Sequence, residues 1–486
     1  MVKKISVANI REKSARGIKW QVGTEVLSRM LQLLFTFVLA RLLTPTDFGI
    51  IGVAFIFTRL TFVLFDLGLS SALIQRKELQ KIQLQSAQTV FLLSATVFFV
   101  AIYFASPYIA VFFHYARLKS ILRVLGTIFF LFALRAIPNV QLTRKMRFKA
   151  IGLIWLASVL VYGALAMGFA LSGFGVWSFV FGLLGQELTL TLLTLVVARQ
   201  WLPPAWQFGR LKELTAFGSQ VLASRVVGYL NINLPNAIIG RFMGSATLGY
   251  YSVGYQLVDF PVQRISKNIL RVMFPAFSKL QDNLPQYQQL YKDTVSGLAL
   301  LVFPVFAGMA LVAPEFVSVF YGPKWQALVP VLEILTVVGL ARSIWVTTSV
   351  VFLSKGKPQW ELLINLIYFA MLSFVLFLVY RQGLVVVVTF IALVLLFFVG
   401  IALMASLRMI RLSILEWFKL VRTPAFATAA MVGILLGLRL TGIQHWPAVI
   451  RLFILVVTGI LIYLVTVYGI DRKAFARFKS ILGRSS

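Results

Sequence analysis

The chain has 486 residues, of which 60% are hydrophobic and only 13% are charged, and its mean hydropathy is +0.90. Soluble domains are about half apolar and carry about 25% charge, so the composition excludes an ordinary soluble protein. The chain has no cysteine and only two histidines, His114 and His445, far apart. This excludes disulfides, thiolate catalysis and a histidine metal cluster, and we expect no metal and no cofactor.

Long apolar runs recur along the chain, and about 20 apolar residues are enough to span a bilayer. We predict an all-α, polytopic membrane protein with about fourteen transmembrane helices. The predicted helices cover 18–43, 48–74, 85–106, 118–140, 151–171, 176–198, 214–243, 248–272, 293–313, 327–353, 361–380, 384–407, 422–440 and 449–468. Short turns such as "TPTD", "SGFG" and "GSAT" separate many of them.

The formal net charge of +31 would suggest a nucleic-acid partner in a soluble protein. In a membrane protein, Lys and Arg instead gather in cytoplasmic loops. Here they gather in both terminal tails and in the loops on the same side, whereas the opposite loops hold little beyond Arg117, Lys119, Lys324 and Arg381. We therefore predict cytoplasmic termini, no nucleic acid, and a basic C-terminal tail on anionic membrane lipid.

Two stretches of the sequence match at a constant offset. Arg41, Gly49 and Val53 recur 200 residues later as Arg241, Gly249 and Val253, and Arg135 lines up with Arg342. The pattern predicts two pseudo-symmetric six-helix lobes of the same orientation around a central cavity. The predicted division is a basic tail (1–17), an N-lobe (18–198), a cytoplasmic linker (199–213), a C-lobe (214–407), two additional helices (408–468) and a second basic tail (469–486).

Ionisable residues inside several predicted helices are the main functional signal, because each costs about 2.5–3.5 kcal/mol at the bilayer centre. We interpret one group as cavity residues for an anionic substrate: Arg29, Arg59, Arg225, Arg264, Arg135, Arg342, Asn231 and Asn233. Candidate coupling or gating residues are Glu25, Asp66 and Asp259, and candidate hinges are Pro235 and Pro261. The alternative is that the charges form buried ion pairs that fix helix packing.

Spacing suggests particular pairs among these charges. Glu25 and Arg29 lie four residues apart on one helix face. Arg59 matches Asp259 at the offset of the repeat, so these two could pair across the lobes. The alternative is local pairing of Arg59 with Asp66 and of Asp259 with Arg264. A further pattern, Gly433-x-x-x-Gly437, predicts a packing face for another helix.

Two classes of function are disfavoured. No G-x-x-x-x-G-K-[ST] motif occurs, so the chain has no built-in P-loop ATPase. The loops predicted outside the cytoplasm are short, and no catalytic constellation is present, which argues against a membrane enzyme such as a polymerase. A purely structural scaffold would not need charges within its membrane helices.

Four motifs, "LARLLTPTDFGIIGVA", "DLGLSSALIQRKE", "VMFPAFSKLQDN" and "VFYGPKWQALVPVLEIL", resemble the polysaccharide-transporter branch of the multidrug/oligosaccharidyl-lipid/polysaccharide (MOP) superfamily, in particular its Wzx-type flippases. The resemblance covers Ala15 to Pro358 well and is weaker beyond. It implies a bacterial inner-membrane protein that flips undecaprenyl-diphosphate-linked oligosaccharide for exopolysaccharide, capsule or O-antigen synthesis. It also implies alternating access and partnership with polymerase and chain-length proteins of the same pathway.

Two other transporters of the same superfamily remain alternatives. A cation-coupled drug exporter would favour an acidic cavity, whereas arginines outnumber acids here. A lipid II flippase would share the mechanism and differ in its substrate. The sequence leaves the sugar, the coupling ion and the oligomeric state open.

Overall fold

The computed structural model describes residues 7–65, 69–75, 80–199, 203, 205, 218–441 and 443–472, and every regular element among them is a helix. The chain divides into two compact units, Met1–Gly249 and Tyr250–Ser486. In the described part of the chain, ten helices are long and apolar enough to cross a membrane by length and composition. The predicted all-α, multi-pass class is therefore confirmed.

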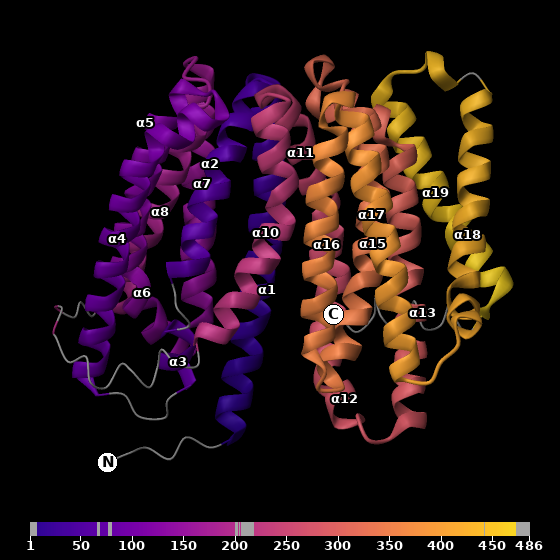
Figure 1. The fold of residues 1–486 in the computed structure, drawn as a ribbon, viewed down its shortest axis with the longest axis horizontal. Helices are drawn as coiled ribbons and strands as arrows, with labels where there is room; N and C mark the ends of the chain where they lie inside the picture. The colour runs from indigo at the N-terminus through magenta and orange to yellow at the C-terminus, as the bar shows by residue number, and fades with distance from the viewer. Residues whose placement is uncertain are drawn as a thin grey trace. The chain divides into compact units, whose positions relative to one another are not determined.

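The first unit is a bundle of helices that lie side by side (Figure 1). Its helices are α1 (Val7–Leu42), α2 (Pro45–Phe65), α3 (Leu69–Gln75), α4 (Lys81–Phe113), α5 (Ala116–Gly126), α6 (Ile128–Arg144), α7 (Phe148–Leu171), α8 (Trp177–Ala198) and α10 (Gly218–Phe242), and α11 (Ser245–Pro261) begins here. Helix α7 packs on α1 and α8, α6 packs on α4 and α8, and α10 packs on α2.

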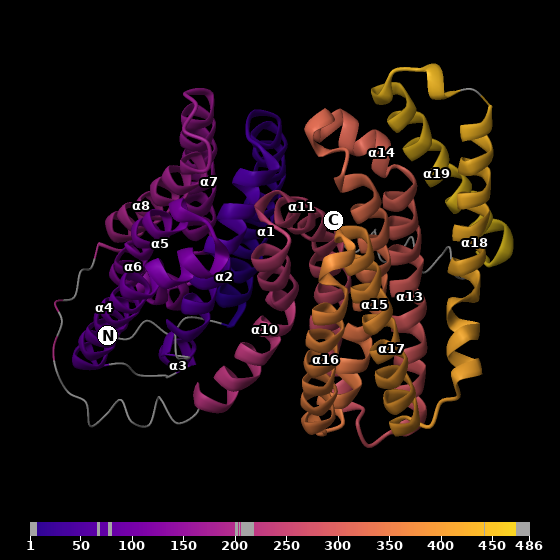
Figure 2. The ribbon, with the colours of Figure 1, turned by 45° about the horizontal axis from the view of Figure 1, so that its top comes forward.

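The second unit contains the end of α11 and the remaining helices. These are η2 (Val262–Lys267), α12 (Asn268–Lys279), α13 (Leu284–Leu311), α14 (Ala313–Phe316), η3 (Val317–Tyr321), η4 (Pro323–Trp325), α15 (Leu328–Ser354), α16 (Pro358–Val379), η5 (Tyr380–Gln382), α17 (Leu384–Met409), α18 (Ile414–Leu440), η6 (Ile443–His445) and α19 (Ala448–Ile470). Helix α15 packs on α13, α16 and α17, while α18 pairs with α19 and also packs on α13 (Figure 2).

The same packing scheme occurs in both units. In the first unit α6 contacts α4, α7 and α8, and α7 contacts α8. In the second unit α15 contacts α13, α16 and α17, and α16 contacts α17. The two sets follow each other in the same chain order, as an internal duplication requires.

Two predicted helices are interrupted. The range 118–140 is divided at Thr127 between α5 and α6, and within 248–272 α11 ends at Pro261, where a π-helical turn, η2, begins. The range 48–74 contains α2 and α3, and residues 66–68 between them lie outside the described residues. Proline lacks the N–H group that would bond to the carbonyl four residues earlier, so a widened turn can follow it inside a helix. Apolar content predicts that a segment is helical but does not predict such local breaks.

The turn before α2 shows why the helix begins at Pro45. The Asp47 carboxylate accepts hydrogen bonds from the Thr44 backbone N–H (3.0 Å) and hydroxyl (2.7 Å), and the Thr44 hydroxyl accepts one from the Asp47 N–H (3.3 Å). This is a capping box with proline at the first helical position. At the matching turn, Gly244 has φ 94° and precedes α11 directly.

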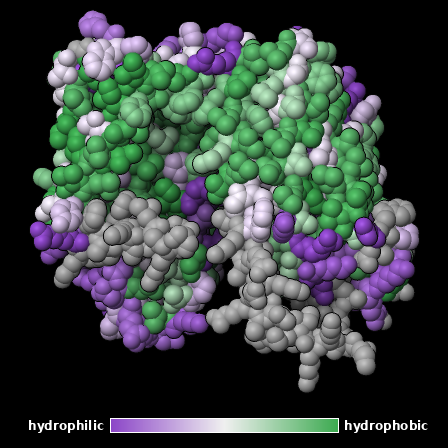
Figure 3. All heavy atoms as spheres, turned by 180° about the vertical axis from the view of Figure 1, so that it is seen from behind, coloured by the Kyte–Doolittle hydropathy of each residue, from purple (hydrophilic) through white to green (hydrophobic). Residues whose placement is uncertain are grey.

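Apolar side chains cover much of the outer helix surfaces, and hydrophilic residues gather toward the helix ends on the face drawn in Figure 3. Tyr108, Leu440 and Phe453 are among the large side chains that are mostly exposed. Gly433 and Gly437 of α18 are also exposed, and a Cβ atom built on either glycine would have no other heavy atom within 4 Å. Such a surface is stable when lipid covers it.

Candidate functional site

Polar residues gather where α10 crosses α2 in the first unit. The Tyr229 hydroxyl of α10 donates to the carbonyl of Ile56 on α2 (2.6 Å), and the Asn233 amide donates to the Tyr229 carbonyl (2.9 Å). The Arg59 guanidinium lies 4.8 Å from the Phe55 ring centroid, and Arg59 itself is exposed. Arg59 and Asn233 are thus brought to neighbouring helices, as expected for residues that share a polar surface.

The structure describes only some of the other predicted site residues of α2 and α10. Asn231 and Pro235 are buried in α10, and the Asn236 amide reaches the Asn233 side-chain oxygen at 3.4 Å. The Arg225 side chain and Asp66 lie outside the described residues. The predicted Arg59–Asp66 pair is therefore untested.

Two of the predicted site residues, Glu25 and Arg29, lie on helix α1. Arg29 is exposed and donates to the side-chain oxygen of Gln32 (3.2 Å), while Glu25 is half-buried. An arginine in a helix predicted to span the membrane remains a candidate for binding an anionic group.

Asp259 of α11 forms an ion pair with Arg342 of α15 (2.6 Å) in the second unit. The two side chains are only 27% and 15% exposed, respectively. The Gln263 amide also donates to the carboxylate (3.2 Å), and the Arg342 guanidinium lies 5.1 Å from the Tyr255 ring centroid. Arg342 is a partner for Asp259 that spacing along the sequence did not indicate.

The residues after Asp259 form the π-helical turn η2, which contains Arg264 and Lys267. Both are half-buried, and η2 packs against α15, the helix of Arg342. Single π-turns occur often at functional sites because they re-aim side chains within a helix. The predicted hinge Pro261 stands directly before this turn.

A matching ion pair lies in the first unit. Arg135 of α6 pairs with Glu187 of α8 (2.6 Å), and the side chains are 16% and 19% exposed. Arg135 and Arg342 were matched by the repeat, yet the first takes its acid from α8 and the second from α11. The duplicated arginines thus keep the same chemistry with partners on different helices.

The sequence did not single out Glu315 as an ion-pair partner. This nearly buried carboxylate, in the short helix α14, accepts from Arg439 (2.6 Å) and lies 4.0 Å from Arg451. The two arginines flank the α18–α19 turn. Arginines on both sides of the turn of one apolar hairpin could have indicated a shared acid near that turn.

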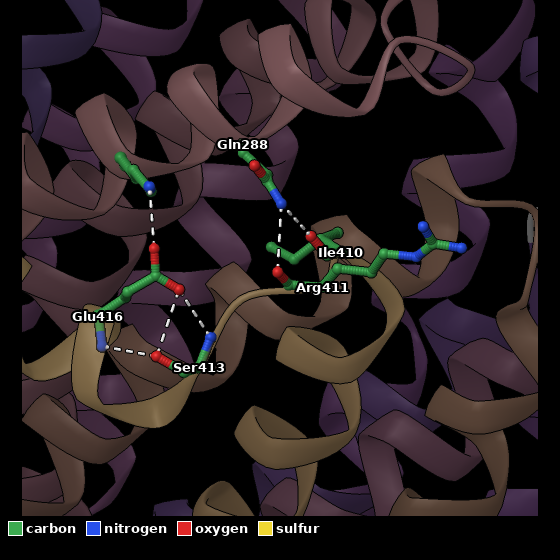
Figure 4. A network of polar contacts seen from close by, with 6 residues as sticks. Gln288, Ile410, Arg411, Ser413 and Glu416 are labelled. Carbon is green, nitrogen blue, oxygen red and sulfur yellow. Dashed lines mark hydrogen bonds and ion pairs between the residues drawn. The ribbon is translucent and has the colours of Figure 1, made fainter.

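A second polar network holds the start of α18 against α13 (Figure 4). The Gln288 amide of α13 donates to the carbonyls of Ile410 (2.8 Å) and Arg411 (3.2 Å), which end α17. Lys292 of α13 pairs with Glu416 (3.3 Å), and Glu416 forms a capping box with Ser413. The α18–α19 hairpin is therefore fixed to α13 at the start of α18 and to Glu315 of α14 near its turn.

No group of three or more His, Cys, Asp or Glu residues that could hold a metal ion occurs within the described ranges. The chemistry that the placed residues offer is recognition of anions by arginine and amide groups on membrane helices. An arginine guanidinium can bind phosphate or carboxylate through two parallel hydrogen bonds.

The fold is that of known membrane transporters. A structure of the lipid II flippase MurJ in an inward closed conformation aligns with a TM-score of 0.75 and 14% identity, covering 94% of this chain and 99% of MurJ. An inward-facing multidrug resistance MATE family transporter of the MOP superfamily aligns with a TM-score of 0.61 and 16% identity, covering 79% and 94%. At these identities the likeness concerns the fold alone.

Sequence comparison gives the family. A family model described as polysaccharide biosynthesis protein matches residues 38–330, and the chain belongs to this family. The teichuronic acid biosynthesis protein TuaB of Bacillus subtilis (strain 168) is 28% identical, covering 98% of this chain and 99% of TuaB. The lipopolysaccharide biosynthesis protein WzxC of Escherichia coli (strain K12) is 27% identical, covering 72% and 71%.

Proposed function

We propose that the protein is a flippase that moves undecaprenyl-diphosphate-linked oligosaccharide repeat units across the bacterial inner membrane, for the assembly of a surface polysaccharide. The observation that carries this proposal is the match over almost the full length to TuaB, within a family of polysaccharide biosynthesis proteins. The likeness to MurJ supports a fold suited to a lipid-linked substrate. A chain with no P-loop motif would take its energy from an ion gradient or from consumption of the product.

The cavity is proposed to use arginines for the diphosphate head group. Arg29 and Arg59 support this role because both are exposed on predicted membrane helices, and Arg264 because it lies on the π-turn. Arg225 remains a candidate on its sequence position. Arg135 and Arg342 each hold an acid in an ion pair, so we assign them first to fixing helices within their units.

The proposed topology has fourteen spans, two six-helix lobes, two additional C-terminal helices, and both termini in the cytoplasm. The repeated packing scheme of α4, α6, α7 and α8 in α13, α15, α16 and α17 supports the duplication. The proposed lobes keep the boundaries 18–198, 214–407 and 408–468. Polymerase and chain-length proteins of the same pathway are the proposed partners.

The test is translocation in vesicles that contain the purified protein. Short-chain undecaprenyl-diphosphate oligosaccharide, lipid II and a cationic drug are supplied in parallel arms, and transfer to the opposite leaflet or lumen is measured. We expect transfer of the oligosaccharide lipid. Transfer of lipid II alone or of the drug alone would replace the proposal with the corresponding alternative, and no transfer in any arm would reject it.

A further inference from the structure

The two matched turns pack on each other through their glycines, inside the first unit. A Cβ built on Gly49 would lie 1.8 Å from the carbonyl oxygen of Ser245. A Cβ built on Gly249 would lie 1.9 Å from the carbonyl oxygen of Pro45. Real Cβ atoms essentially never approach so closely, so both positions require glycine.

The contact is reciprocal, and the duplication explains why. Gly249 follows Gly49 by 200 residues, and Ser245 follows Pro45 by the same 200. Exchange of the two repeats turns one contact into the other. The glycine of α2 therefore contacts the first-turn carbonyl of α11, and the glycine of α11 contacts the first-turn carbonyl of α2. Such a reciprocal contact is what a local two-fold axis produces.

Both carbonyls are already satisfied within their own helices. In α2 and α11, the carbonyl of the first residue accepts from the N–H four residues later, which belongs to the glycine itself. Between the helices, each glycine Cα–H faces a carbonyl, which is a weak interaction. The two helix starts can separate without leaving a backbone group unsatisfied.

Other side chains close around the glycines. Val53 and Leu248 have no exposed surface, and a Cβ on Gly240 would lie 3.0 Å from Leu248 and 3.2 Å from Val53. The Tyr115 hydroxyl donates to the Gly240 carbonyl (2.6 Å) and also bonds to Ser245. Burial raises the pKa of this hydroxyl, so it stays protonated and able to donate.

A polar contact lies beside these residues. The Arg241 guanidinium lies 3.0 Å from Nε2 of His114 and 4.9 Å from the Phe112 ring centroid. Arg241 is the repeat counterpart of Arg41, at the end of α1. This end of the first unit is thus closely packed around the two glycines and polar beside them.

We propose that Gly49 and Gly249 form a symmetric backbone lock that is closed, at this end of the first unit, in one state of the transport cycle and parts in another. The inference rests on the proposed transport function. A contact of weak, satisfied backbone groups suits a switch, because it packs closely yet separates at little cost. Ion pairs such as Asp259–Arg342 lack this property, since breaking them leaves a buried charge.

The test uses the cysteine-free chain in its native membrane. Val53→Cys places one thiol in the buried contact, and its rate of labelling by a membrane-impermeant maleimide is measured. We expect slow labelling with both glycines present. Gly49→Ala and Gly249→Ala should each raise the rate several-fold and by a similar factor, while the double variant should label no faster than either single variant.

Gly168→Ala is the matched control, because nothing lies within 4 Å of a Cβ at that position in the same unit. It should leave the labelling rate unchanged. Unchanged rates in both lock variants, a response to only one of them, or an equal response to Gly168→Ala would overturn the proposal. This readout does not require transport, so it is separable from failure of the proposed function.

A second measurement keeps both glycines and so avoids misfolded variants. His114→Cys and Arg241→Cys are combined and bridged with a reducible bifunctional thiol reagent of about 10 Å reach, and each single-cysteine variant is treated in the same way. Bridging should stop translocation, and reduction should restore it. Translocation at the unbridged rate while the bridge is intact would overturn the lock, even if the transport function stands.

Discussion

The arginines of this protein fall into two groups by their surroundings. Arg135 and Arg342 are mostly buried and paired with acids at 2.6 Å, whereas Arg29 and Arg59 are exposed on their helices. A buried pair contributes mainly by keeping each charge compensated, because the removal of water from both ions offsets most of their attraction. An exposed arginine on a membrane helix is by default a candidate for binding a ligand, which is the role proposed for Arg29 and Arg59.

We expect Arg29→Ala, Arg59→Ala, Arg225→Ala and Arg264→Ala each to lower polysaccharide export strongly while protein remains in the membrane. Lysine at the same positions should restore export in part, because the charge returns without the two-pronged geometry of the guanidinium. Export is measured as surface polymer in a strain that lacks the native gene. Normal export by all four alanine variants would show that these arginines do not bind the substrate.

The Asp259–Arg342 pair gives a prediction of stability. Asp259→Ala leaves Arg342 uncompensated and should destabilise the protein by about 3–5 kcal/mol, whereas Asp259→Leu combined with Arg342→Met should recover most of this loss. The midpoint of thermal unfolding in detergent measures the loss of stability in the single variant and its recovery in the double variant. The control is Lys292→Ala, which removes a pair whose side chains are 31% and 42% exposed and should cost less than about 1 kcal/mol.

At the scale of elements, close helix packing depends on a few small residues. Gly163 of α7 faces Phe35 of α1, and a Cβ on this glycine would lie 2.2 Å from the phenyl ring. Gly168, on the exposed side of the same helix, has open space around it. The approach of α1 to α7 is therefore set by the absence of a side chain at position 163.

Gly163→Ala should destabilise the protein by about 1–3 kcal/mol, because the added methyl group displaces a buried ring. Gly168→Ala should be neutral or stabilise by up to about 1 kcal/mol through higher helix propensity. Thermal unfolding of the two variants, purified in parallel, compares them directly. Equal midpoints would mean that α1 and α7 are not closely packed in solution.

At the scale of the whole molecule, the distribution of Lys and Arg sets the proposed orientation in the membrane. A reporter enzyme that is active only in the periplasm, fused after residue 472, should be inactive. The same reporter inserted in the turn at residues 173–175, between α7 and α8, should be active. Periplasmic activity of the C-terminal fusion would reverse the proposed topology.

The sequence left two partners open for Asp259, Arg59 across the repeat and Arg264 nearby, whereas Arg342 pairs with it inside the second unit. We therefore expect Asp259→Arg to abolish export and Asp259→Arg with Arg342→Asp to restore more activity than Asp259→Arg with Arg59→Asp. Export is compared at equal amounts of membrane protein. Greater recovery with the Arg59 swap would establish the pairing across the repeat in at least one state.

The sequence alone was enough for features that depend on composition and on order along the chain. Sixty per cent hydrophobic residues in long runs require membrane helices, and the nearly constant offset that relates Arg41, Gly49 and Arg135 to later residues identifies the repeat. Both are statistical signals that survive without knowledge of contacts. They predicted the helical class and the family resemblance, which the family match confirms.

The tertiary structure decided which residues meet. Asp259 pairs with Arg342, 83 residues away, and Glu315 pairs with Arg439, 124 residues away. These residues meet because helices that are distant in the sequence pack side by side. Spacing on one helix can predict only neighbours on its own face. The sequence matched Gly49 with Gly249. Only the fold shows that the carbonyl of Ser245 occupies the place of a Cβ atom on Gly49, and that the carbonyl of Pro45 does the same for Gly249.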